Sequence, residues 1–196
     1  EISLDLLWHP EYSIVHSPFC ACLSDRIIVQ WRKRFCLISN IGGCVMEKYL
    51  PLLQKSPLFA AMAPGEILSV LHCVGAAVRE SGAGEYILPA GSPTQAMGLL
   101  LSGSALAIQE DLWGERNIMG KIQPPGTFAE PFAATPGAVL NVSIVANAPA
   151  KVLFLSIQRI LTVCSETCPQ HALLIRNLVS VLARKNLQLN DKITHM

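Results

Sequence analysis

The chain has 196 residues, of which 51% are hydrophobic and 15% are charged. Its 15 Lys and Arg residues against 14 Asp and Glu leave a net charge of +1, which lacks the basic excess of nucleic-acid-binding domains and predicts that this segment alone does not hold DNA. The low charged fraction predicts a surface partly covered by another subunit. Apolar runs end before about 18 residues and no secretory leader pattern occurs, so we predict a cytoplasmic protein with no membrane contact.

Residues 1–45 differ from the rest of the chain in sequence pattern, because they show no sustained hydrophobic periodicity. We predict that they form an extension outside the core domain, and the pattern leaves open whether they belong to the natural protein. An odd total of seven cysteines argues against a disulfide framework and favours reduced thiols. Four of these cysteines fall in the extension, namely Cys20, Cys22, Cys36 and Cys44.

Residues 46–74 have a helical pattern. Leu50 and Leu53 can share one face of a helix, and Pro64 suits a first helical position because Glu66 and apolar residues follow it. The pattern predicts two short helices ahead of the main domain.

Residues 75–155 consist of short apolar runs separated by glycine turns, which is typical of β-strands. A mainly β sandwich or barrel-like roll follows from so many strands at this spacing. The predicted strands are 76–79, 86–88, 97–101, 105–108, 116–122, 139–146 and 151–155.

The hydrophobic period becomes helical again after Ser156. We predict a short helix over 158–164 and a long one after Cys168 and Pro169, which at 1.5 Å per residue would reach about 40 Å. A helix of this length exceeds what a small roll needs, so we expect it to pair with its copy in a homodimer. The residues expected at this dimer interface are Leu174, Leu178, Val181, Leu182, Lys185 and Leu189.

Four segments resemble, in order and spacing, the landmarks of the cyclic-nucleotide-binding roll of CRP/FNR transcription regulators: Ser56-Pro-Leu-Phe59, Gly84-Glu-Tyr-Ile87, Pro89-Ala-Gly91 and Leu100-Leu-Ser-Gly-Ser104. The resemblance implies a double-stranded β-helix (jelly roll) with flanking helices over 46–167 and a dimerisation helix over 168–196. It also implies a winged helix-turn-helix that would follow Met196 and bind DNA, a domain that this chain does not contain.

The ligand cassette of that family pairs a glycine and a glutamate at the start of a short helix and places an arginine ten residues after the glutamate. Glu130 fits the glutamate, which in the family bonds a ribose hydroxyl, whereas Ala129 stands at the glycine and Leu140 at the arginine. No Lys or Arg occurs from Gly126 to Asn147. Because a buried cyclic phosphodiester needs a cation or a ring of amide donors, we expect no binding of cyclic AMP or cyclic GMP.

Leu189, followed by Asn190, falls where the cyclic-AMP binders of the family present a hydroxyl to the adenine. An apolar contact there favours a lipid-like, aromatic or weakly charged effector, and the pattern equally allows a pocket filled by its own side chains. No cofactor is assigned. The candidate ligand-binding residues are Glu130, Phe132, Leu140, Asn141, Ser143, Leu189 and Asn190.

Catalytic and metal sites have little support in the sequence. None of the five histidines falls in a predicted strand and no His-x-His occurs, which argues against a cupin enzyme. The cysteine spacing fits an iron–sulfur cluster poorly, and Pro169 separates Cys164 and Cys168 from His171. We therefore predict the effector-sensing and dimerisation module of a transcription regulator and no catalytic or metal residue. A stand-alone ligand-binding or interaction domain without a DNA partner is the alternative.

Overall fold

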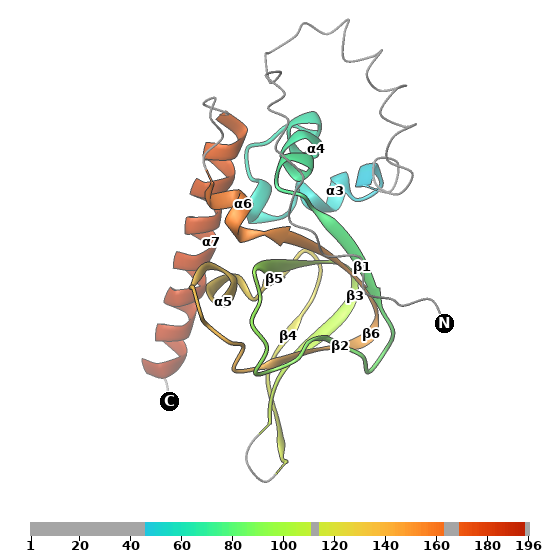
Figure 1. Ribbon diagram of the computed structural model, residues 1–196, viewed down its shortest axis with the longest axis vertical. Coiled ribbons are helices and arrows are strands. Elements are labelled where there is room, and N and C mark those ends of the chain that lie inside the picture. The colour runs from blue at the N-terminus through green and yellow to red at the C-terminus, as the bar shows by residue number, and fades with distance from the viewer. Residues whose placement is uncertain (1–45, 111–113, 163–168, 195–196) are drawn as a thin grey trace, which may run out of the picture.

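The computed structural model describes residues 46–110, 114–162 and 169–194. Among the described residues, the short helices α3 (Leu50–Leu53), η1 (Pro57–Phe59) and α4 (Pro64–Cys73) precede the sheet, and Figure 1 labels α3 and α4. Proline opens each of them, where a missing N–H costs nothing. Glu66 stabilises the start of α4, because its Oε2 accepts a hydrogen bond of 2.8 Å from the amide of Ala63. This contact is the largest cause that holds the pKa of Glu66 below its usual value.

Six antiparallel strands form the roll, which confirms the predicted mainly β fold with flanking helices. The sheet has the order β1-β6-β3-β4, while β2 pairs with β6 and β5 pairs with β3. The strands are β1 (Ala77–Ser81), β2 (Tyr86–Leu88), β3 (Ala96–Glu110), β4 (Arg116–Ile122), β5 (Thr127–Phe128) and β6 (Ser143–Ser156).

Two pairs of predicted strands are in fact single long strands. β3 continues through the expected turn at 102–104, and β6 joins the later part of 139–146 to 151–155. The register between β3 and β6 shifts at Leu100/Ser102 and Ser102/Ser104, so β3 bends by irregular pairing instead of ending. Gly103, at φ +82°, allows this bend because a Cβ there would meet the carbonyl oxygen of Pro149 at 2.3 Å.

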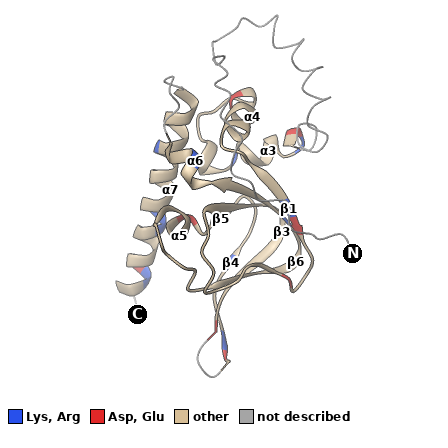
Figure 2. Ribbon diagram, viewed as in Figure 1, with Lys and Arg blue, Asp and Glu red and all other residues tan. Residues whose placement is uncertain are grey.

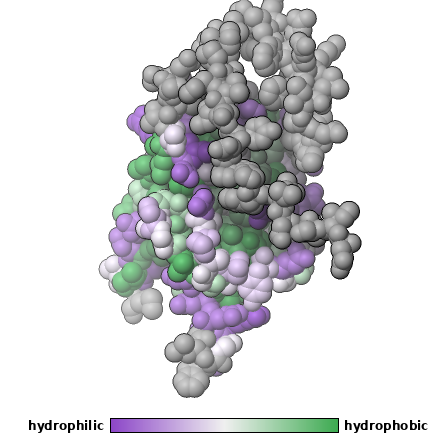
Figure 3. Space-filling model, in the orientation of Figure 1, coloured by the Kyte–Doolittle hydropathy of each residue, from purple (hydrophilic) through white to green (hydrophobic). Residues whose placement is uncertain are grey.

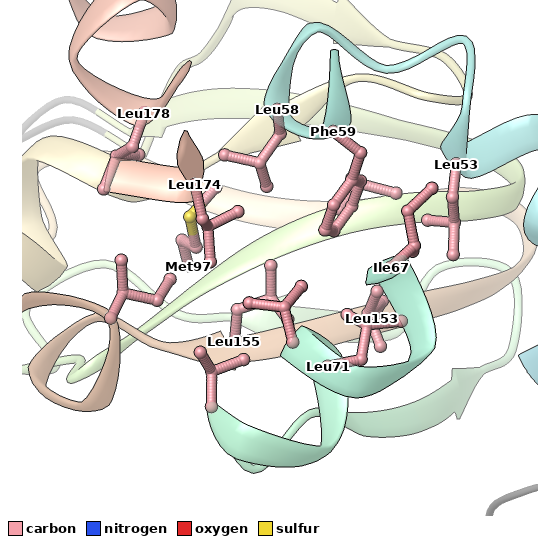
Figure 4. Packing of buried hydrophobic residues seen from close by; sticks show 14 of the residues in the cluster. Leu53, Leu58, Phe59, Ile67, Leu71, Met97, Leu153, Leu155, Leu174 and Leu178 are labelled. Atoms are coloured by element: carbon pink, nitrogen blue, oxygen red, sulfur yellow. The ribbon is translucent and has the colours of Figure 1, made fainter. Parts of the chain in front are cut away.

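β3 and β6 separate two hydrophobic cores. The helix-side core lies between these strands and the helices, and Figure 4 shows Met97 beside Leu174 and Leu153 close to Ile67 and Leu71. The second core, which we call the roll interior, takes the alternate side chains of the same strands. Its buried members are Leu100, Ala105, Phe128, Ala129, Leu140, Ile144, Ala146, Ala150, Val152 and Phe154.

Two helices follow the roll, the short α6 (Ile157–Leu161) and the long α7 (Pro169–Thr194). α7 has 26 residues and runs along one side of the molecule, past α6 and α5 (Figure 1). Asn177 fixes its first half to η1, since Nδ2 donates to the carbonyls of Leu58 and Ala60 at 3.1 and 2.9 Å. No helix within the described ranges is long and apolar enough to cross a membrane.

Candidate effector site

The candidate site begins at the short helix α5 (Glu130–Ala134), which directly follows β5. Ala129 precedes this helix in the left-handed conformation, with φ of 64° and ψ of 9°. That conformation costs an L-residue about 1–2 kcal/mol and explains why the family resemblance places a glycine here. The backbone of the cassette is therefore retained although the glycine is not.

Glu130 is buried, with 1% of its surface exposed, and its carboxylate is paired with a cation. Nζ of Lys185, on α7, donates to Oε1 of Glu130 at 2.7 Å and to the carbonyl oxygen of Thr127 at 2.6 Å. A buried carboxylate without a partner would cost several kcal/mol, on the order of the penalty for burying an unpaired ion. Lys185 removes that cost by reaching across from the long helix.

The roll interior beside this ion pair is apolar. Leu140 is 2% exposed and belongs to it, so the position of the family arginine holds a packed leucine. Two aromatic rings meet edge to face, since the centroids of Phe128 and Phe154 lie 6.5 Å apart at an interplanar angle of 87°. Figure 2 shows that most of the ribbon of the roll carries no charged residue. The position of the family arginine thus offers no cation, although the guanidinium of Arg79 lies over the Phe154 ring, with Cζ 5.2 Å from the ring centroid.

Three of the predicted ligand residues lie at this interior. Glu130 and Leu140 are buried, and Phe132 packs against the interior from α5. Ser143 is also buried, and its Oγ accepts a hydrogen bond of 3.0 Å from the amide of Ala90, which leaves its O–H free to donate. Asn141 is exposed.

The prediction that Leu189 and Asn190 contribute to the pocket stays a prediction. Both are exposed on α7, and within the subunit it is Lys185 that contacts Glu130. The sequence alone places Lys185 among the residues expected at the dimer interface. A lysine in an apolar helical row, and a glutamate without the arginine of the family cassette, were the two features that could have suggested this ion pair. They are 55 residues apart, so local sequence does not connect them.

Leu174, Leu178 and Val181, which the sequence predicts at a dimer interface, lie in the interior of the chain. With His171 and Lys185 they form what we call the inner row, which faces the roll. The adjacent outer row consists of Ile175, Val179, Leu182, Asn186, Leu189 and Ile193, and Figure 3 shows hydrophobic surface along the side where α7 lies.

Metal ligands do not gather among the residues that the structure describes. His171 is a core residue whose Nε2 lies 2.6 Å from the carbonyl oxygen of Ile160. The extension 1–45 with its four cysteines, and Cys164 and Cys168, lie outside the described residues.

Comparison with family models gives no match, and no curated protein matches the chain. Solved structures are similar. The sensor domain of the transcriptional regulator DNR from Pseudomonas aeruginosa is 20% identical with a TM-score of 0.60, over 78% of this chain and 95% of that one. The Thermus thermophilus catabolite activator protein is 24% identical with a TM-score of 0.60, over 71% of this chain and 62% of that one.

A cyclic-nucleotide-binding domain from Methylobacillus flagellatus is 16% identical with a TM-score of 0.64, over 76% of this chain and 84% of that one. These likenesses agree with the β-roll. The described part of the chain thus has the fold of the cyclic-nucleotide-binding domains found in CRP/FNR-type sensor modules.

Proposed function

We propose that this chain is the effector-sensing and dimerisation module of a CRP/FNR-like transcription regulator and not an enzyme. One observation carries the proposal: a single helix, α7, contacts the candidate site through Lys185 and also exposes the large apolar side chains of Val179, Leu189 and Ile193 in its outer row. A change in the site can therefore alter the packing of a helix that two subunits share.

The outer row supports a homodimer. Its members are spaced by four and three residues in alternation, the repeat that brings two helices together along a continuous seam. Leu189 is 57% and Ile193 71% exposed, although both are large and apolar. Asn186 stands within the row, and a single polar residue in such a seam favours one register of pairing.

The effector that we propose is neither cyclic AMP nor cyclic GMP. The roll interior is apolar, Leu140 replaces the family arginine, and Lys185 is already paired with Glu130. An added phosphodiester would carry a negative charge next to that carboxylate without a cation of its own.

Sedimentation equilibrium of two variants tests the dimer. We expect Leu189→Glu to shift the chain to monomer, because it places a charge in the outer row. Leu187→Glu is the matched control, since Leu187 is 63% exposed but lies on another side of α7. If both variants dissociate equally, or neither does, the outer row is not the interface.

A thermal-shift titration of the full chain tests the effector. Cyclic AMP and cyclic GMP are expected to leave the melting temperature unchanged, whereas a compound with an alkyl or aryl body and no phosphate group should raise it. Stabilisation by a cyclic nucleotide would overturn the assignment of Leu140. The reading frame after Met196 tests the link to DNA: we expect it to encode a helix-turn-helix, and its absence would favour the stand-alone domain.

A further inference from the structure

α7 leaves the roll at Lys185. The inner row is buried as far as Val181, Lys185 is half-buried, and all nine described residues from Asn186 to Thr194 are exposed. The first half of the helix has separate anchors in its buried leucines and in Asn177. Lys185 is therefore the last residue of α7 that is at least half-buried, and its contacts attach the helix to the roll at that position.

The contacts of Lys185 resemble those of a bound ligand. The side chain of Glu130 is 2% exposed and that of Lys185 is 40% exposed, so the carboxylate is fixed inside while the ammonium enters from outside. Two acceptors, Oε1 of Glu130 and the carbonyl oxygen of Thr127, lie within 2.7 Å of Nζ. An ammonium group satisfies both acceptors and the buried negative charge together.

We propose that Lys185 is an internal ligand of the effector site, and that the effector is a small primary amine whose ammonium group displaces Lys185 from Glu130 and Thr127. The proposal rests on the proposed function, in which this site senses a small molecule. Exchange of one ammonium for another keeps the charge of the site constant and needs no proton transfer. It removes the anchor of α7 at the same time.

The chemistry of the site selects this class of ligand. Both groups that contact Nζ are hydrogen-bond acceptors, and one of them is a carboxylate. A carboxylate or phosphate ligand would be repelled by them, and a quaternary ammonium has no N–H to donate to them. Phe128, Leu140 and Phe154 make the neighbouring interior apolar, which favours an alkyl or aryl body on the amine over a polar one.

Amine labelling of the wild-type chain tests the internal ligand. Lys192 lies on the same helix and is exposed, which makes it the internal standard. With an acylating reagent followed by mass spectrometry, we expect Lys185 to react about tenfold more slowly than Lys192, because its charge-assisted hydrogen bonds must break first. Glu130→Gln should bring the two rates closer. Equal rates in the wild-type chain would overturn the proposal.

Chemical rescue tests the class of ligand. Lys185→Ala removes three methylenes and the amine, which together correspond to n-propylammonium. Adding n-propylammonium chloride to this variant should raise its melting temperature by about 2–4 °C, whereas tetramethylammonium chloride at the same ionic strength should not. Lys192→Ala is the control, and because its Lys185 competes for the site, n-propylammonium should raise its melting temperature less than that of Lys185→Ala.

The results separate this inference from the proposed function. Equal effects of the two salts on Lys185→Ala would exclude an ammonium site, even if the Leu189→Glu variant proved the dimer. Conversely, selective rescue by n-propylammonium together with a monomeric wild-type chain would support the ammonium site and refute the proposed dimeric regulator.

Discussion

Gly103 and Gly84 share a backbone φ of +82° but differ in their surroundings. A Cβ on Gly84 would meet nothing within 4 Å, whereas one on Gly103 would meet the carbonyl oxygen of Pro149 at 2.3 Å. We expect Gly84→Ala to lower the free energy of unfolding by about 1 kcal/mol, from left-handed strain partly offset by a stiffer unfolded chain. Gly103→Ala should lower it by about 3 kcal/mol, since backbone must also move. Urea unfolding measures both; equal losses would contradict the close approach.

Residue types alone identified only part of the site. Glu130 was predictable because it opens a short helix after a strand in a recognisable order of glycine turns. Its partner was not, because the contact between Lys185 and Glu130 depends on how far α7 runs beside the roll. The hydrogen bond that Ser143 Oγ accepts from the amide of Ala90 likewise joins residues 53 apart and cannot be predicted from local sequence.

At the scale of the element, α7 carries two apolar rows, and periodicity alone does not say which one faces the roll. The prediction combined residues of both rows, because Leu178 and Leu182 are four apart and lie near each other on the helix. Packing separates them: Leu178 is buried in the helix-side core and Leu182 is only half-buried. The predicted strands show the same limit, since the glycine turn at 102–104 proved to be a bend within β3.

A pair of identical substitutions on α7 tests this division. Leu178→Ala should lower the free energy of unfolding by about 3 kcal/mol, as expected for a cavity in a packed core. Leu187→Ala should change it by less than about 0.5 kcal/mol, because that side chain is exposed. Chemical denaturation at low protein concentration is the measurement, and similar losses for the two variants would show that the inner row is not packed as described.

At the scale of the whole molecule, one ion pair joins the roll to the C-terminal half of α7. We expect Lys185→Met to lower the free energy of unfolding by about 2 kcal/mol, since it leaves the carboxylate of Glu130 buried without its cation. Glu130→Gln in the same chain should restore most of that loss. A double-mutant cycle by urea unfolding gives the coupling energy, and additive effects would mean that the two side chains do not interact.

Because β3 and β6 give alternate side chains to the two cores, both cores depend on one register. Val152 and Phe154 face the roll interior, while Leu153 and Leu155 face the helices. Insertion or deletion of a single residue in this stretch would turn the side chains of the roll interior toward the helices and those of the helix-side core into the roll, which would disrupt the packing of both cores. The length of these strands is therefore far more constrained than the identity of any one apolar residue in them, and the sensing interior cannot be remodelled by changing strand length without also unfolding the helical layer.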